Sequence, residues 1–255
     1  MNAVLTIAGN TFRETVRNKI MANILLFAVA MVGITLIISN WSLDQQAKIL
    51  KDFGLAAVSL FGLLIAMFVG VRTIYQEIEK RTIYMLVSKP IRRWKIIVGK
   101  YAGLAATIAV NVAAITACLL LADLLIEGAV DWGLLPGVAL ILVEIFLVIA
   151  FAVFFSTFTS PLLSAVLTLM VYVLGHLAPS LRLYTQLRPG DSFNSVLLAI
   201  YHVIPNLENF NIKTAVVDHL PLMPGTVEFA LVYGLAYISL LLLATCLVFE
   251  RKDLK

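Results

Sequence analysis

Residues 134–158 read LLPGVALILVEIFLVIAFAVFFSTF, and Glu144 is the only charged residue in this stretch. A helix needs about 20 consecutive apolar residues to cross the hydrocarbon core of a bilayer. A helix on the surface of a soluble protein would carry polar residues along one face. The stretch therefore predicts a membrane-spanning helix, because irregular backbone facing lipid would leave its polar groups unpaired.

The composition of the whole chain agrees with this prediction. Of its 255 residues, 61% are hydrophobic and 13% are charged. Soluble domains are about half apolar and about a quarter charged, and disordered chains are poor in apolar residues, so both classes are excluded. The net charge of +4 comes from basic residues beside apolar runs, which is typical of membrane topology and does not indicate nucleic-acid binding.

We predict an all-α integral membrane protein in which residues 1–255 form a single transmembrane domain with six spans. The first span is not followed by a small-residue cleavage site, so we expect it to be retained as a helix and not removed as a signal peptide. The predicted spans are residues 20–39, 53–71, 96–125, 134–158, 162–181 and 227–249.

The distribution of Lys and Arg predicts the orientation. Placing the N-terminus inside puts 14 of the 19 Lys and Arg residues on the inner side, which favours two cytoplasmic termini and a cytoplasmic loop over residues 72–95. The connection between the third and fourth spans then lies outside. It contains only acids among its charged residues, namely Asp123, Glu127 and Asp131.

Two further segments have an amphipathic pattern. Residues 1–19 place Leu5 and Phe12 on an apolar stripe and Arg13 and Arg17 on a polar one, which predicts a helix in the inner interface. A solvated extension of the first span is the alternative. Residues 182–226 are too long for a turn, and their apolar residues recur at helical spacing. This predicts a helix on the outer leaflet, or a lid over the spans, that an outer-side partner could contact.

Residues 77–103, EIEKRTIYMLVSKPIRRWKIIVGKYAG, connect the second and third spans. Residues 77–88 can form a short helix, and Pro90 disfavours helix in the residue before it. An apolar surface on a cytoplasmic elbow, with basic residues next to the membrane, suits the docking of a partner. The alternative is an ordinary basic inner loop, but that reading explains the charges and neither the apolar run nor the proline.

The residues in this stretch resemble a known family. Glu77-x-Glu79, Thr82, Leu86, Ser88-Lys89-Pro90, Arg92-Arg93 and Gly99-Lys100 are similar to the permease subunits of the ABC type 2 exporter class. Residues 249–254, FERKDL, match the way in which those permeases leave their last span. Residues 205–211, PNLENFN, resemble the outer segment of a subgroup that includes the permease for nitrous-oxide-reductase maturation.

The resemblance implies a permease in a bacterial cytoplasmic membrane that forms a homodimer and binds two cytoplasmic ATPase subunits. The ATPase subunits would bind ATP and Mg, and this chain would carry no cofactor. Residues 77–88 would be the coupling helix that transmits ATP-driven movement to the spans. The residues expected to dock the ATPase are Glu77, Glu79, Thr82, Ile83, Leu86, Lys89, Arg92 and Arg93.

No enzymatic site is predicted on this chain. A phosphate-binding loop needs GxxxxGK[ST], but at Gly99-Lys100 the first glycine is replaced by Trp94 and the Ser or Thr by Tyr101. Cys118 and Cys246 lie in apolar runs on opposite sides, so we expect free thiols. No Cys/His spacing predicts a metal site.

Glu144 lies near the middle of its span, where a charge costs about 2.5–3.5 kcal/mol. We expect it to face protein or a water-filled cavity, either as a polar residue of the pathway or dimer interface, together with Asn111, or as a packing residue. His176, at the outer end of the fifth span, is expected to be a satisfied histidine and not a proton relay.

Three other functional classes compete with the ABC permease. An ion-coupled secondary transporter usually has several intramembrane acids or broken helices, which this chain lacks. A membrane-embedded enzyme would need a convergent site that Glu144 alone does not provide. A non-conducting scaffold that recruits cytoplasmic partners would share the docking loop.

Overall fold

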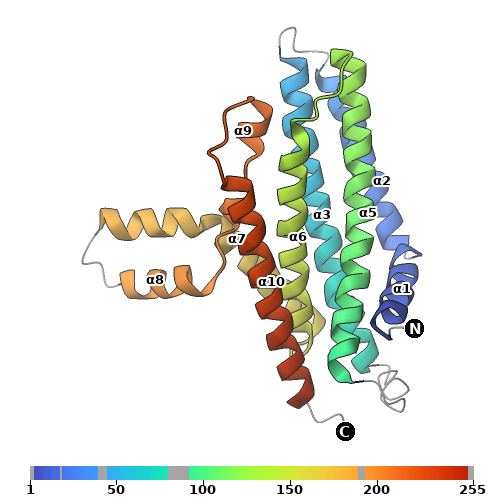
Figure 1. The fold of residues 1–255 in the computed structure, drawn as a ribbon, viewed down its shortest axis with the longest axis vertical. Coiled ribbons are helices and arrows are strands. Elements are labelled where there is room, and N and C mark those ends of the chain that lie inside the picture. Colours follow the sequence, from blue (N-terminus) through green and yellow to red (C-terminus); the bar gives the residue numbers. More distant parts are fainter. Residues whose placement is uncertain (1–2, 18, 40–44, 80–91, 189–192, 252–255) are drawn as a thin grey trace.

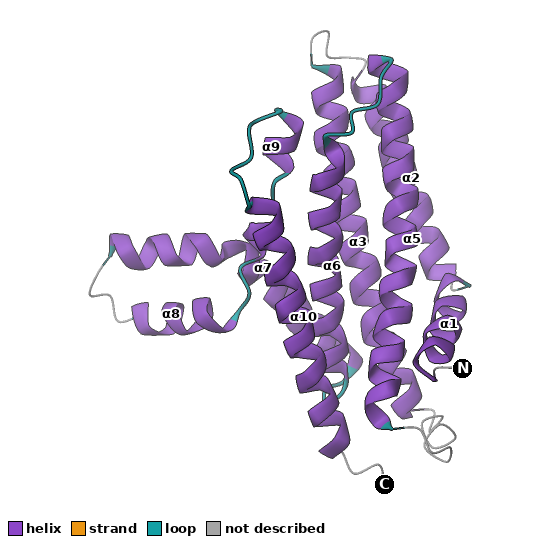
Figure 2. Ribbon diagram, viewed as in Figure 1, coloured by secondary structure: helices purple, strands orange, loops and turns teal. Residues whose placement is uncertain are grey.

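The computed structural model describes residues 3–17, 19–39, 45–79, 92–188 and 193–251, and every regular element in these ranges is a helix (Figures 1 and 2). The elements are α1 (Ala3–Val16), α2 (Lys19–Ser39), α3 (Gln46–Glu79), α5 (Arg93–Glu127), α6 (Leu134–Ser156), α7 (Pro161–Leu187), α8 (Asn194–Val203), the 3-10 helix η1 (Leu207–Phe210), α9 (Lys213–Val217) and α10 (Thr226–Arg251).

Five helices are long and apolar enough to cross a membrane: α3 over Gln46–Arg72, α5, α6, α7, and α10 over Thr226–Glu250. The predicted all-helical membrane fold is therefore confirmed. In α2 the apolar stretch is Ala22–Ile37, which is shorter than those of the five long helices, so the first predicted span, residues 20–39, stays a prediction.

Some element boundaries differ from those predicted. The fifth span was expected to end at residue 181, but α7 continues past Pro179 to Leu187. Residues 77–79 of the expected coupling helix belong to the end of α3, and the rest of that helix lies outside the described residues. These differences arise because helices continue beyond the apolar stretch on which the predicted limits were based.

The core of the bundle surrounds α6, which packs against α3, α5, α7 and α10. Leu140, Ile141 and Leu147 of α6 are fully buried. On α3, Gly62 faces the Ile145 side chain and Gly70 faces Ala152, so the two helices approach closely. By contrast, α7 and α10 leave most of their surface uncovered by the rest of the chain.

The N-terminal helix α1 packs on α5 through two glycines. A Cβ atom at Gly103 would lie 2.6 Å from the Ala8 carbonyl oxygen, and one at Gly99 would lie 2.9 Å from the Ile7 Cβ atom. Small residues spaced four apart allow such contact between helix backbones in membranes. The pattern Gly99-x-x-x-Gly103 therefore fixes the position of α1.

The exposed surface of α1 has two different faces. Leu5 and Val16 are exposed on one side, while Arg13 and Arg17 are exposed on another, and Thr11 is buried against the bundle. A helix with one protein-facing, one apolar and one basic face suits the boundary between lipid and water. The interfacial position of residues 1–19 stays a prediction, with which the exposed apolar and basic residues of α1 agree.

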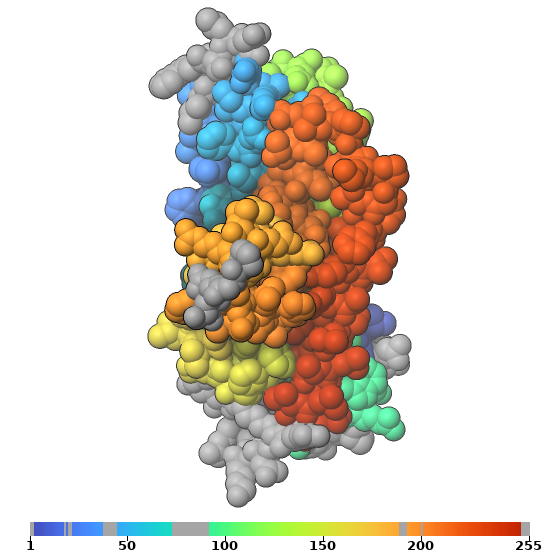
Figure 3. Space-filling model, turned by 90° about the vertical axis from the view of Figure 1, so that its left-hand side faces the viewer, coloured from blue at the N-terminus to red at the C-terminus, as the bar shows by residue number. Residues whose placement is uncertain are grey.

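The long segment between α7 and α10 divides into two parts. The distal end of α7 and the whole of α8 lie side by side and project sideways from the bundle (Figure 1), and Figure 3 shows this arm in front of the bundle. Phe193 and Val196 are exposed there. The second part, η1 and α9, returns to the bundle, where Leu207 and Phe210 are fully buried.

Gly103→Ala is expected to lower the free energy of unfolding by about 1–3 kcal/mol, because the new methyl group overlaps the backbone of α1. Gly9→Ala is the matched control: no atom lies within 4 Å of its added methyl group, so the change in helix propensity should raise stability by up to about 1 kcal/mol. Thermal unfolding in detergent measures both. Equal effects of the two variants would contradict the close contact.

Candidate functional site

The end of α3 and the start of α5 lie at the same end of the bundle as the C-terminal end of α10 (Figure 1). Glu77 and Glu79 of the predicted docking set lie in the last turn of α3. Arg92 is exposed immediately before α5. The other predicted docking residues, Thr82, Ile83, Leu86 and Lys89, lie outside the described residues.

Arg93 joins two spans at this end of the bundle. Its guanidinium group donates to the carbonyl oxygens of Phe249, at 3.4 Å, and Glu250, at 3.2 Å. The last carbonyls of a helix lack partners within the helix and carry its negative dipole end, so a cation is favourable there. Arg93 was predicted only as a docking residue, but the structure shows that it also ties the start of α5 to the end of α10.

The two polar residues predicted for the pathway or dimer interface are both buried within one copy of the chain. Glu144 is 2% exposed, so it faces protein, as its charge requires. Asn111 is 6% exposed, and its Nδ2 donates to the Thr107 carbonyl oxygen at 2.8 Å within α5. Neither lies on the outer surface of the bundle in this structure.

Glu144 is paired with a histidine of the neighbouring helix. Its Oε1 lies 3.4 Å from Nε2 of His176 on α7, and Nδ1 of His176 lies 3.2 Å from the Tyr172 carbonyl oxygen. The Tyr172 side chain lies near Ser59 of α3. The pairing of Glu144 and His176 was not predicted from the sequence. The presence of an acid and a base on consecutive apolar spans could have indicated it.

A second polar cluster connects α3, α5 and the loop that follows α5. Nζ of Lys51, a side chain only 3% exposed, lies 3.0 Å from Glu127 Oε2, 3.0 Å from Asp131 Oδ2 and 3.6 Å from Asp123 Oδ1. Asp123 also accepts the Asp131 backbone N–H at 2.9 Å, and His219 Nε2 lies 3.6 Å from Asp131. In the sequence these charged residues were used only to predict orientation, and the ion pairs between them were not predicted.

Burial opposes the ionisation of Asp131, but the ion pair with Lys51 and the hydrogen bond from the Gly133 backbone N–H hold the pKa of its carboxyl group below the ordinary value. Asp131 therefore stays ionised at neutral pH and can pair with Lys51. Among the described residues, no group of His, Cys, Asp and Glu side chains is arranged to hold a metal ion. The cluster acts as an ionic link between helices.

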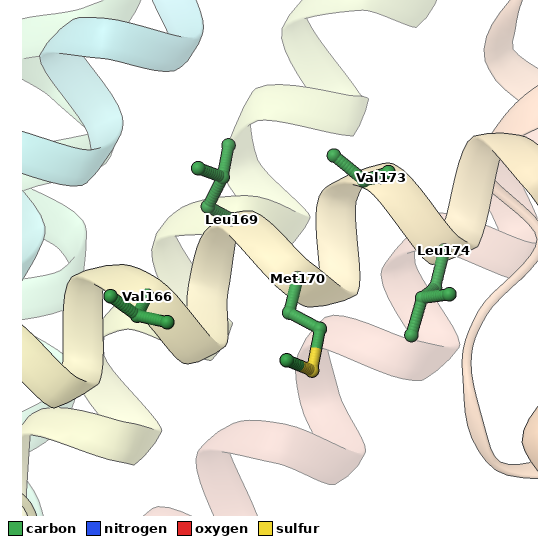
Figure 4. Close-up of a pocket in the computed structure, with 5 residues that line it drawn as sticks. All are labelled: Val166, Leu169, Met170, Val173 and Leu174. Atoms are coloured by element: carbon green, nitrogen blue, oxygen red, sulfur yellow. The ribbon is translucent and has the colours of Figure 1, made fainter.

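A shallow apolar depression lies on the surface of α7 (Figure 4). Five apolar side chains line it, and no polar side chain is among them. Such a surface suits contact with lipid or with another apolar helix. The lining residues are Val166, Leu169, Met170, Val173 and Leu174.

Lys51→Met is expected to lower the free energy of unfolding by about 3–5 kcal/mol, since it leaves the fully buried Asp123 without its cation. Lys48→Met is the matched control in the same helix. Lys48 forms an exposed ion pair with Asp218, so its removal should cost about 0–1 kcal/mol. Thermal unfolding of both variants in the same detergent tests this, and a neutral Lys51→Met would contradict the role of the cluster.

A comparison with curated proteins gives no match. A comparison with protein families matches residues 5–254 to the model described as ABC-2 family transporter protein. The match extends from α1 through all of α10, and so it includes every helix described above. The chain belongs to the ABC-2 family of transporter proteins.

Proposed function

We propose that this chain is the membrane-spanning permease subunit of an ATP-driven ABC exporter. Membership of the ABC-2 family makes it a membrane subunit that has no ATPase site of its own and associates with a cytoplasmic ABC ATPase. The family match over nearly the whole chain is the observation that carries this proposal. We further propose that the complex exports its substrate and lies in a bacterial inner membrane. It would contain a homodimer of the permease and two ATPase copies.

Six spans agree better than five with the course of the chain. In Figure 1, α3 begins at the end of the bundle opposite to that at which α10 finishes. The N-terminal helix α1 and the end of α10 lie toward the same end of the bundle (Figure 1). We therefore propose that the chain crosses once more before α3 through α2, whose 21 residues are long enough to do so.

The proposed docking element is residues 77–88, which begin in the last turn of α3 and precede α5 in the chain. Movement of a partner bound there would act on both helices. The bonds from Arg93 to the end of α10 would pass the same movement to the last span. The structure thus supports coupling through three spans.

The surfaces of α7 and α10 that the chain leaves uncovered are available for a second permease copy and for lipid. Exposed apolar residues on these helices include Leu162, Met170, Val232 and Leu243. The arm formed by the end of α7 and α8 is the proposed contact for an outer-side partner. A pathway or interface role for Glu144 and Asn111 stays a prediction, because both are buried within one copy here.

Affinity purification of the tagged chain from its native membrane tests the proposal. We expect an ATPase subunit to copurify in about equal amount, and Leu86→Glu to remove it by placing a charge in the apolar docking surface. Thr6→Glu is the control, because it adds the same charge on the same side, at an exposed position of α1 outside the docking segment.

Both variants should reach the membrane at the level of the unchanged protein, as measured by membrane fractionation. Retention of the ATPase by Leu86→Glu would contradict docking at residues 77–88. Absence of any ATPase from the unchanged protein would contradict the proposed function itself.

A further inference from the structure

Glu144 and His176 meet inside the membrane-spanning bundle, on α6 and α7. The Glu144 side chain is 2% exposed and that of His176 is 25% exposed, and Oε1 lies 3.4 Å from Nε2. No described group donates a hydrogen bond to either carboxylate oxygen of Glu144. An ionised carboxylate without a donor is unfavourable at such a position.

The hydrogen bond of Nδ1 determines whether Nε2 of a neutral His176 ring carries a hydrogen or a lone pair. Nδ1 lies 3.2 Å from the carbonyl oxygen of Tyr172, one turn earlier in α7. A carbonyl oxygen can only accept, so Nδ1 carries a hydrogen. In a neutral imidazole Nε2 would then present a lone pair toward Glu144, and only a proton between the two atoms makes the contact attractive.

We propose that Glu144 and His176 together bind one proton, held between Oε1 and Nε2. The proton is either on the carboxyl group, which donates to neutral imidazole, or on the imidazolium, which donates to the carboxylate. Both forms contain the same atoms and have no net charge, so the pair can lie in an apolar bundle. The shared proton links α7 to α6 at the centre of the bundle. The projecting arm begins in the same helix α7.

The other ionisable groups around the pair do not replace this proton. Lys213 on α9 and Glu208 on η1 act on Glu144 through space, and their charges are opposite. From α3 the polar side chain near Tyr172 is the uncharged Ser59. Tyr172 itself stacks beside His176, with ring centroids 4.6 Å apart. The inference concerns the chain alone and does not depend on the proposed transport function.

Nitrogen NMR of the folded protein labelled at histidine tests the proposal directly. The chain has three histidines, so His176→Gln assigns the signals of His176 by their loss. His202 is the internal control: its Nδ1 also faces the carbonyl oxygen of the residue one turn earlier, Leu198, at 2.6 Å. Within the described residues no carboxylate forms an ion pair with His202.

We expect Nδ1 of His176 to be protonated and its Nε2 to give a proton-sharing signal that stays unchanged between about pH 5.5 and pH 8, while Nε2 of His202 gives no such signal. Glu144→Gln should turn the Nε2 signal of His176 into that of an unprotonated nitrogen. The proposal would be overturned if Nδ1 of His176 is unprotonated. It would also be overturned if Glu144→Gln leaves the Nε2 signal of His176 unaltered.

Thermal unfolding against pH provides a second test. An unfolded Glu and His, with ordinary pKa values of about 4.3 and 6.5, together bind one proton between these pH values, two below them and none above them. A folded pair that always holds one proton stabilises the protein most between these values and less on either side.

The difference in melting temperature between the unchanged protein and the double variant E144Q/H176Q should therefore be bell-shaped in pH. A difference that stays constant from about pH 6 to pH 9 would show that the folded pair holds no extra proton, since linkage requires it to fall there.

Discussion

A polar side chain inside a membrane bundle has no water to stabilise it, so its partner must come from the fold itself. Most of the specific contacts in this protein follow from that constraint. Tyr101 on α5 donates to the Phe146 carbonyl oxygen of α6 at 3.1 Å, and Ser164 at the start of α7 donates to the Ala152 carbonyl oxygen at 3.3 Å. These bonds, like the pair formed by Glu144, all end on α6. The central helix is therefore the common partner of its neighbours.

The sequence was sufficient to predict the helical membrane fold, because apolar runs of spanning length have few other stable structures. It also predicted that Glu144 faces protein or a water-filled cavity, and the structure buries it among protein. It did not predict the partner of Glu144, because helix periodicity places a residue on a face without saying which distant helix covers that face. The buried Lys51 was missed for the same reason. Residues 182–226 were expected to lie on the outer leaflet or to form a lid over the spans, and within this segment Leu207 and Phe210 are buried in the bundle. The pattern was read correctly as amphipathic, but the apolar side meets protein.

Arg93 shows how one side chain can belong to both the docking region and the bundle. Its position next to Arg92 suggested an exposed basic surface, and nothing in the sequence connects it with residues 249 and 250. The structure places these segments together because α5 begins where α10 ends. A contact of this kind depends on the topology of the bundle, which a local motif does not contain.

The uneven enclosure of the helices also affects how the protein responds to its surroundings. Contacts within the chain cover most of α3 and α6, whereas α7 and α10 meet their surroundings over most of their length. Contacts between these two helices and the lipid acyl chains therefore contribute part of the free energy of folding. Bilayer thickness and lipid composition should act first on α7 and α10, and only through them on the enclosed helices. The packing around α7 and α10 therefore depends on the surrounding lipid as well as on the amino-acid sequence.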